Sequence, residues 1–361
     1  MIGQVGIVGA GLIGASIGMA LERRQLPAAL LVDSTPGRAQ TAAALRAGQE
    51  ASEADLVRCD HIILAVPPSA VASVLLRLQG LNLHATFSDV ASVKTSVLAE
   101  AKALDCDMSR FCGAHPIAGR ERGGPTAAIP ELFDESIWVS TPTPETSPDA
   151  RAAVSWLAEQ CGGRAVEMSA AEHDRALAVV SHLPQFVASL LAAQLPAAGG
   201  WGPLLAGRGF RDTTRLADSD PELWVQIAAA NRVALAECLT AHEGRVAAAI
   251  EALEADDTAA VGALLALGRD ARQALPTKAS RTPVSWTRIG VVLQDRPGEL
   301  ARLFAVAGDA GVNIEDVSID HAADHPVGLV ILDVADQGAD TLSDAVRQAG
   351  WHALTLGHIG T

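Results

Sequence analysis

The sequence of 361 residues contains no tyrosine and only three lysines, Lys94, Lys102 and Lys278. The missing tyrosine excludes dehydrogenase mechanisms in which a tyrosine acts as the general base. Hydrophobic residues make up 49% of the chain and charged residues 19%, which is typical of a globular protein with an ample core. This length predicts two or three domains.

Cysteines are few, odd in number and without a C-x-x-C pair, so neither a disulfide framework nor a zinc or other metal site is expected. A reducing cytoplasm is the simplest interpretation. The chain begins directly with a strand pattern and not with a signal peptide. The most apolar helical stretch, 176–195, is interrupted by polar residues and proline, so we expect no membrane span. The five cysteines are Cys59, Cys106, Cys112, Cys161 and Cys238.

The net charge of −15 argues against nucleic acid or an anionic membrane as a partner. A small anionic substrate could still be bound by a few local arginines. Arg208, Arg211 and Arg215 lie close together in a glycine-containing stretch and could bind carboxylates bidentately. They could equally form a solvated basic face that pairs with Asp212 and Asp218, and spacing alone leaves both interpretations open.

Three domains are expected from the pattern of strands and helices. Residues 1–150 alternate short apolar strands with helices, which predicts an α/β dinucleotide-binding domain of the Rossmann type. Residues 151–280 have no strand pattern and predict an all-α domain, whose apolar surface favours a homodimer. Residues 285–361 read as βαββαβ, the ferredoxin-like order, after a linker at 275–283. The strands expected in the first domain are 4–9, 29–33, 61–66, 85–90, 110–115 and 136–141.

The stretch GAGLIG at 9–14 matches G-x-G-x-x-G in the context that makes this motif specific: after a strand, at the start of a helix. Gly9 would permit the tight turn, Gly11 would let the pyrophosphate approach the backbone, and Gly14 would let helix and strand pack closely. Asp33, at the end of the next strand, would bind the adenosine ribose and favours NAD, although Arg38 leaves NADP open. The expected cofactor residues are Gly9, Gly11, Leu12, Ile13, Gly14, Asp33, Val66, Pro67 and Asp89.

His115 lies in the stretch GAHPIAGRE (113–121), which we expect to be a loop at the end of a strand. Ligands of open α/β sheets bind at the carboxyl ends of the strands, so this imidazole would meet a nicotinamide and a substrate. An ordinary pKa near 6.5 suits proton transfer. Ser92 is also expected at a strand end, where it could equally be a helix N-cap, and Lys94 could equally be a solvated surface charge.

Five motifs together resemble prephenate dehydrogenases, a family related to arogenate and cyclohexadienyl dehydrogenases, over about residues 1–280. They are GxGLIGxS at 9–16, D-x-x-S-x-K at 89–94, HPIAG-x-E at 115–121, EHD…SHLP at 172–184 and GF-x-D-x-T-R-x-A-x-S-x-P-x-x-W at 209–224. The resemblance implies that prephenate is the substrate and NAD the cofactor. It departs at Gln185, where the family often has histidine.

The resemblance also implies roles for individual residues. His115 would accept the proton of the ring hydroxyl, and Ser92 would hydrogen-bond that hydroxyl and the histidine. Arg215 would hold a substrate carboxylate, with Arg211 beside it, and His182 would line the pocket. Glu121 and Asp212 would shape the pocket entrance.

Three alternatives were weighed. A β-hydroxyacid dehydrogenase would require a catalytic lysine in the helical domain, and no lysine lies between residues 103 and 277. An arogenate dehydrogenase would use the same chemistry, but the strand end at 138–142 offers no carboxylate for an ammonium, which favours prephenate. A non-catalytic NAD-binding amino-acid sensor is disfavoured by the intact set of His115, Ser92 and Arg215.

The C-terminal segment 287–361 resembles an ACT domain through DRPGEL at 295–300 and GVNIEDVSI at 311–319. This resemblance implies feedback control by an amino acid, with tyrosine as the expected effector. Asp295, Gly298, Asn313 and Ile314 are the expected ligand contacts. A purely structural dimerisation module is the alternative.

Overall fold

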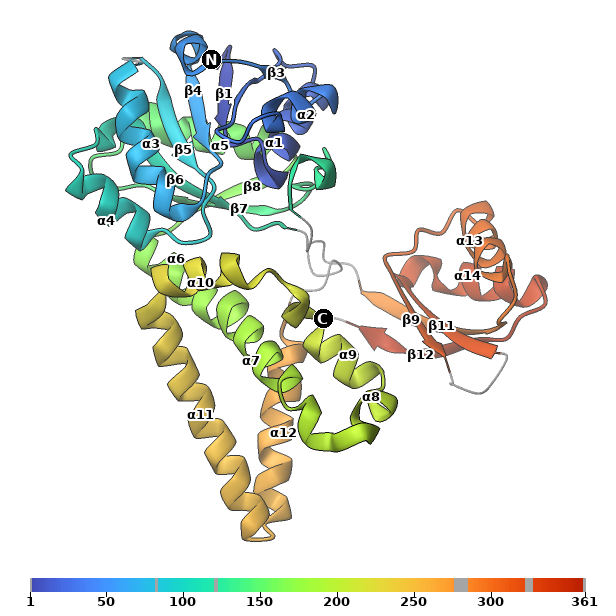
Figure 1. Ribbon diagram of the computed structural model, residues 1–361. Coiled ribbons are helices and arrows are strands. Elements are labelled where there is room, and N and C mark those ends of the chain that lie inside the picture. The colour runs from blue at the N-terminus through green and yellow to red at the C-terminus, as the bar shows by residue number, and fades with distance from the viewer. Residues whose placement is uncertain (1, 82–83, 120–122, 276–284, 322–326, 360–361) are drawn as a thin grey trace. The chain divides into compact units, whose positions relative to one another are not determined.

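The computed structural model describes residues 2–81, 84–119, 123–275, 285–321 and 327–359 (Figure 1). The chain divides into two compact units, residues 1–247 and 248–361. The nucleotide-binding region and most of the helical region belong to the first unit. The expected linker at 275–283 lies almost entirely outside the described residues.

The first unit is built on an eight-stranded sheet in the order β3-β2-β1-β4-β5-β6-β7-β8. The first six positions have the doubly wound order of dinucleotide-binding sheets, and their strands are parallel. β7 runs antiparallel to β6, and β8 is parallel to β7. The strands are β1 (Val5–Val8), β2 (Leu30–Val32), β3 (Gln49–Glu50), β4 (His61–Leu64), β5 (Thr86–Asp89), β6 (Phe111–Pro116), β7 (Ile137–Thr141) and β8 (Arg164–Glu167).

Two of these strands correct the expectations from sequence. β8 shows that the expected all-helical character from residue 151 onward is wrong, because the sheet extends to Glu167. β3 is two residues long and was also not predicted.

His115 lies inside β6 and not in a loop, because β6 continues to Pro116 by pairing His115 with Val139 of β7.

Helices cover both faces of the sheet (Figure 1). One core contains apolar side chains of α3 and α4 together with those of β4 and β5. A second core contains side chains of α1, α2 and α5 together with those of β1 and β2. The helices are α1 (Leu12–Arg23), α2 (Arg38–Ala44), α3 (Pro68–Leu81), α4 (Thr95–Ala103) and α5 (Pro148–Gln160).

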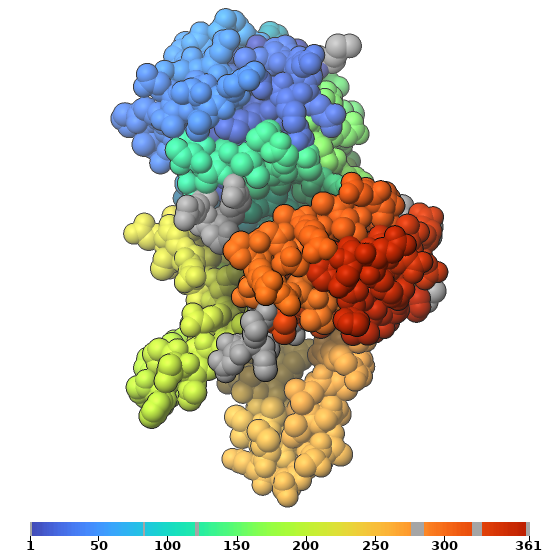
Figure 2. Space-filling model, turned by 90° about the vertical axis from the view of Figure 1, so that its right-hand side faces the viewer, coloured from blue at the N-terminus to red at the C-terminus, as the bar shows by residue number. Residues whose placement is uncertain are grey.

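After β8 the first unit is helical. α6 (Ala170–Leu177) continues through a π-helical turn, η4 (Ala178–His182), into α7 (Leu183–Ala192). Figure 2 shows the later helices, in yellow-green, extending from the sheet-containing body in blue to green. These later elements are η5 (Leu195–Trp201), α8 (Gly202–Leu205), α9 (Arg208–Thr214), η6 (Arg215–Asp218), α10 (Pro221–Ala230) and α11 (Arg232–Glu254), which runs past the unit boundary.

The helical run Ala170–Leu205 has the length and apolarity of a membrane span, with a mean hydropathy of 1.6 in its most apolar window. By itself, one such helix is weak evidence for a membrane protein. His173, Asp174 and His182 of this run are buried and hydrogen-bonded within the first unit. The run therefore contributes a polar face to the interior of that unit.

The second unit contains α12 (Thr258–Gln273) and the expected βαββαβ sequence. The four strands form an antiparallel sheet in the order β10-β11-β9-β12, which is the ferredoxin-like arrangement. Apolar side chains of both helices pack on one face of this sheet. The elements are β9 (Trp286–Gln294), α13 (Glu299–Asp309), β10 (Asp316–His321), β11 (Val327–Ala335), α14 (Asp336–Gln348) and β12 (Ala353–Ile359).

Candidate active site

Glycines shape the turn between β1 and α1. Gly9 has a φ of +104°, and a Cβ there would lie 2.2 Å from the carbonyl oxygen of Ala65. A Cβ on Gly14 would lie 2.0 Å from the carbonyl oxygen of Gly9. Gly11 faces open space, with nothing within 4 Å of its Cβ position. Two glycines are therefore required by the turn itself, and the third leaves room for a ligand.

This turn fits the pyrophosphate of NAD. Gly11 is the N-cap of α1 and supplies no capping side chain, and the first turn has no acidic residue. The N–H groups of α1 are therefore available to an anion. The carboxylate of Asp33 accepts the N–H of Ala10 at 2.7 Å and lies 3.9 Å from Arg38, at the carboxyl end of β2, where a ribose would be bound.

The other expected cofactor residues differ in their exposure. Leu12 and Ile13 are half-buried at the start of α1, and Val66 and Pro67 follow β4, with Pro67 exposed. Asp89 differs from the others, because its side chain has no exposed surface and its carboxylate is hydrogen-bonded to protein groups.

Asp89 and Lys94 form a buried ion pair at the end of β5. Asp89 accepts the N–H of Ala114 at 2.9 Å and that of Ala91 at 3.1 Å. The Lys94 ammonium donates to Asp89 and, at 2.7 Å, to the carbonyl of Ala114. Lys94 is completely buried, so the alternative of a solvated surface charge is wrong.

His115 belongs to a chain of hydrogen bonds that crosses from β6 to α6. Its Nδ1 lies 2.9 Å from Nε2 of His173, and Nδ1 of His173 lies 2.8 Å from a carboxylate oxygen of Asp174. Asp174 also accepts the backbone N–H groups of Lys94 and Thr95, at 2.9 and 2.8 Å. Asp174 therefore caps α4, and the expected capping by Ser92 is wrong.

The electrostatics of this chain favour one tautomer. Burial raises the pKa of Asp174, but hydrogen bonds from His173, Thr95 and Lys94 outweigh it and hold that pKa below its ordinary value. Nδ1 of His173 donates to the ionised Asp174, and we assign the remaining hydrogen bond so that Nε2 of His173 accepts from Nδ1–H of His115. This leaves Nε2 of His115 unprotonated.

His115 is neutral at physiological pH. Burial lowers its pKa well below the ordinary value, and the nearby Lys94, His173 and His182 lower it further, against an opposing effect of Asp174. A neutral imidazole with an unprotonated Nε2 is a proton acceptor. Among the described residues, Nε2 of His115 has no hydrogen-bond partner, so a substrate hydroxyl could reach it.

His182 joins the same buried region. Asn231 donates to the carbonyl oxygen of Asp174 at 2.8 Å and lies 3.1 Å from Nδ1 of His182. The ring of Trp224 meets that of His182 edge-on, with centroids 6.0 Å apart. Burial lowers the pKa of His182, so this imidazole is also neutral. Gln185, one turn further on, is buried, and its Oε1 has no hydrogen-bond partner among the residues that the structure describes.

The expected arginines border a different cavity. Arg211, Arg215 and Asp218 line a space of about 350 Å³ with Phe210 and apolar residues of η5 and α8. None of the residues that line it belongs to the hydrogen-bonded series His115–His173–Asp174, which we call the histidine chain. Asp212 does not line it, and the alternative of a solvated basic face stays open for this segment.

Two further residues are expected near His115. Glu121 lies outside the described residues. Ser92 is half-buried in the turn before α4, and no hydrogen bond joins it to His115 among the described residues. Conversely, no role is predicted from the sequence for three residues that the structure brings to this site: His173, Lys94 and Asn231. The EHD motif was a signal for His173, whereas no local pattern marks Asn231.

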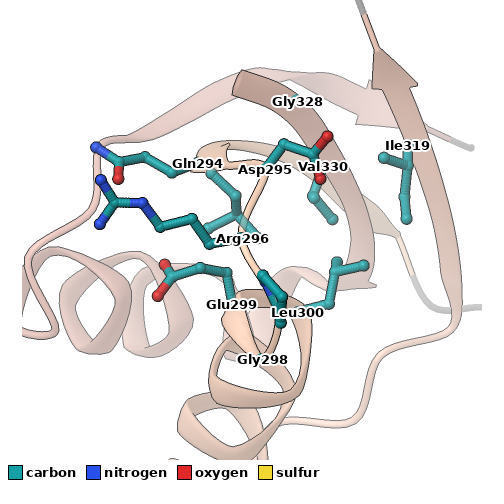
Figure 3. Close-up of a pocket in the computed structure, with 11 residues that line it drawn as sticks. Gln294, Asp295, Arg296, Gly298, Glu299, Leu300, Ile319, Gly328 and Val330 are labelled. Carbon is teal, nitrogen blue, oxygen red and sulfur yellow. The ribbon is translucent and has the colours of Figure 1, made fainter. Parts of the chain in front are cut away.

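A second candidate site lies in the ferredoxin-like domain, where a cavity of about 360 Å³ opens beside the β9–α13 turn. In Figure 3, Asp295 lies on the side of the turn that faces Ile319 and Val330, whereas Arg296 and Glu299 extend to the other side. Of the expected ligand contacts, Asp295 and Gly298 line this cavity, and Gly298 has a φ of +93°.

The other two expected contacts, Asn313 and Ile314, are absent from the lining. Asn313 donates to the side chain of Glu315, and Ile314 packs against the core of the domain.

In comparisons with known proteins, two family models match consecutive segments of this chain. The model for the prephenate dehydrogenase nucleotide-binding domain matches residues 17–167, and that for the prephenate dehydrogenase dimerization domain matches residues 169–267. The probable prephenate dehydrogenase NovF of Streptomyces niveus is 33% identical over 358 residues, covering 96% of this chain and 98% of that protein.

Other relatives cover less of the chain. The cyclohexadienyl dehydrogenase of Zymomonas mobilis is 33% identical over 64% of this chain and 82% of its own length. Prephenate dehydrogenase from Aquifex aeolicus, solved with hydroxyphenyl propionate and NAD⁺, superposes with a TM-score of 0.69 at 27% identity and covers 76% of this chain and 98% of that one. Synechocystis arogenate dehydrogenase gives 0.66 at 30% identity, covering 74% and 98%.

Proposed function

This chain belongs to the prephenate dehydrogenase family and is an NAD-dependent oxidoreductase, and from this premise we propose that it converts prephenate to 4-hydroxyphenylpyruvate and CO₂. The observation that carries the proposal is the chain His115–His173–Asp174 at the carboxyl end of β6. It supplies a neutral base at the edge of the sheet where a dinucleotide binds. We further infer that the enzyme acts in tyrosine biosynthesis as a cytoplasmic homodimer.

The reaction needs a hydride acceptor, one base and a carboxylate clamp. NAD, when bound to the β1–α1 turn and Asp33, would supply the hydride acceptor for the carbinol carbon of prephenate. Nε2 of His115 takes the hydroxyl proton, and the ring carboxylate leaves as CO₂ with its bonding electrons left in the ring. The proton then returns from His115 to the phenolate oxygen of the product. The ring becomes aromatic, which provides the driving force, so positioning and one base suffice.

Substrate contacts follow from the same proposal. Arg215, with Arg211 beside it, binds a substrate carboxylate, because a guanidinium presents two donors to two oxygens. His182 lines the ring pocket next to the base, and Asp212 and Glu121 shape the entrance. Ser92 hydrogen-bonds the substrate hydroxyl. The cavity bordered by Arg211 and Arg215 supports a site for an anionic group in this helical region.

Formation of NADH with prephenate and, separately, with arogenate tests the proposal. We expect turnover with prephenate. Arogenate is the alternative substrate, because one relative is a cyclohexadienyl dehydrogenase and one related structure is an arogenate dehydrogenase. Absence of turnover with either substrate would reject the dehydrogenase.

The variant His115→Asn tests the base itself. Asparagine retains a polar group of similar size but cannot accept the proton at neutral pH, so we expect kcat to fall by roughly 10²–10⁴-fold, the range for loss of a general base. The dissociation constant for NAD should be unchanged. Turnover retained at the wild-type level would remove His115 from the mechanism.

A second role, feedback regulation, is favoured by the cavity of the C-terminal domain. We infer that this domain is an ACT domain and that the cavity binds tyrosine. Asp295 can pair with the ammonium of an amino acid, the N–H groups at the start of α13 can bind its carboxylate, and Ile319 and Val330 offer an apolar wall to its ring.

Isothermal titration calorimetry of the full-length protein with tyrosine, phenylalanine and tryptophan tests the regulatory role. We expect tyrosine to bind, to inhibit turnover, and to bind more weakly to Asp295→Ala. If none of the three amino acids binds or inhibits, the domain is structural.

A further inference from the structure

Lys94 makes contacts at both ends of the histidine chain. Its ammonium reaches the carbonyl of Ala114, the residue immediately before His115, at 2.7 Å. Its backbone N–H donates to Asp174 at 2.9 Å, and the oxygen that accepts it is the one that meets Nδ1 of His173. The hydrogen bonds therefore close a ring that runs from His115 through His173, Asp174 and Lys94 back to Ala114.

The ring depends on side chains on the β5 side of β6, because the pairing of β5 with β6 ends here while β6 stays paired with β7. β5 and β6 pair at Phe87 with Phe111 and at Ser88 with Cys112, and the ladder goes no further. Beyond it, the N–H of Ala114 is taken by the carboxylate of Asp89, and its carbonyl by Lys94. The ion pair of Asp89 and Lys94 thus supplies, at Ala114, the hydrogen bonds that a continued β5–β6 pairing would have made. Ala114 directly precedes His115.

We propose that Lys94 is a positioning residue of the catalytic base, which it holds through Ala114 on one side and through Asp174 on the other. The inference deepens the proposed function and rests on it. Burial of an ammonium and a carboxylate is costly, and an apolar pair of similar size could fill the same space with equal stability. A buried charge directly beside the base also has a chemical effect that an apolar side chain would lack.

That effect is on the protonation of His115. The groups with the largest effect on its imidazole are Lys94, His173 and His182, which disfavour the protonated form, and Asp174, which favours it. The carboxylate of Asp89 also lies here, on Lys94 and on the N–H of Ala114. Burial lowers the pKa of Lys94 while Asp89 opposes that effect, and the ammonium disfavours a second positive charge on the ring. Without Lys94, the pKa of His115 rises, and the base becomes protonated at a higher pH.

The test is Lys94→Met, which removes the charge and the donor but keeps an unbranched side chain. Lys102→Met is the matched control, because Lys102 lies on α4 near its end, is half-exposed, and pairs with Glu145 on the surface. We expect Lys94→Met to bind NAD with the wild-type dissociation constant while kcat falls about a hundredfold, as a misplaced catalytic group predicts. The acidic limb of the kcat–pH profile should move to higher pH.

Lys94→Gln serves as the second variant, because it is also neutral but retains a donor for the carbonyl of Ala114. We expect Lys94→Gln to show the same shift of the acidic limb with a smaller fall in kcat. Wild-type kcat and an unmoved acidic limb in Lys94→Met would overturn the proposal. If neither Lys94 variant folds where Lys102→Met does, Lys94 acts in folding alone and the positioning role is rejected.

A readout without turnover separates this inference from the proposed function. Titration of His115 by ¹⁵N NMR, in protein labelled on its histidine rings, should report a raised pKa in Lys94→Met even if neither prephenate nor arogenate is oxidised by the wild type. An unchanged His115 titration would overturn the electrostatic role, whatever the substrate.

Discussion

Two histidines of the first unit, the buried His61 and the half-buried His115, show that burial does not identify the base. His61 is held at both ring nitrogens, by Thr86 and Ser88, each at 2.9 Å. His115 is held at Nδ1 alone, by His173. A ring with both nitrogens occupied has no acceptor to offer a substrate, so His61 is structural and His115 is the chemically competent one.

The titration of His61 gives a pH dependence of stability. Burial lowers its pKa to about 4, against an ordinary value of 6.5. The unfolded chain therefore binds the proton more tightly, and the stabilising contribution is complete above pH 6.5 and lost as the pH falls toward 4. A difference of this size corresponds to about 3 kcal/mol, at about 1.4 kcal/mol for each unit.

The prediction is tested by chemical unfolding of the wild type and His61→Gln at several pH values. Glutamine keeps two hydrogen-bonding groups but does not titrate, so the loss of unfolding free energy between pH 7 and 4 should be smaller in the variant by up to about 3 kcal/mol. Parallel curves for the wild type and His61→Gln would contradict the assignment.

At the scale of elements, the β1–α1 turn separates glycines required by the fold from one that serves a ligand. A methyl group at position 14 collides with the carbonyl of Gly9, whereas one at position 11 meets nothing. Gly11 also has an ordinary φ of −77°, so alanine is sterically allowed there.

We therefore predict opposite behaviour for Gly11→Ala and Gly14→Ala. Gly11→Ala should fold with the wild-type melting temperature and bind NAD at least tenfold more weakly, because the methyl group occupies the approach to the backbone. Gly14→Ala should lose about 2 kcal/mol or more of stability, as overpacking does. Calorimetric melting and fluorescence titration with NADH measure both. Unchanged NADH binding in Gly11→Ala would place the pyrophosphate elsewhere.

The sequence predicted the elements whose signals are local. The β1–α1 turn, the order of the ferredoxin-like domain and the placing of His115 at a strand end all follow from residues close in the chain. β8 could not be predicted from the sequence, because its four residues, RAVE, show no alternation of apolar and polar side chains and lie between two helices. The cap of α4 was assigned to Ser92 because Asp174, which provides it, lies 79 residues from Thr95 and no local pattern connects them.

At the scale of the whole molecule, α11 carries large apolar side chains that the described chain does not cover. Val233, Ile250 and Leu253 are 63%, 50% and 67% exposed. Exposed apolar side chains in such number indicate an association surface. The whole helix lies within the segment that matches the dimerization domain of the family, so we expect a second copy of the chain to cover it.

Charged substitutions on α11 test this expectation. Ile250→Glu combined with Leu253→Glu places two carboxylates on the surface that would be buried, and a buried unpaired charge costs several kcal/mol. We predict that sedimentation equilibrium finds a dimer for the wild type and a monomer for the double variant. Val57→Glu, an equally exposed apolar position on η1 (Glu53–Arg58), is the control and should remain dimeric. A double variant that stays dimeric would place the interface on another surface, and a monomeric wild type would remove the dimer altogether.

The same double variant links the dimer to activity. α11 directly follows Asn231, which contacts both His182 and Asp174. If dimerisation holds these residues in position, the monomeric variant should also lose turnover.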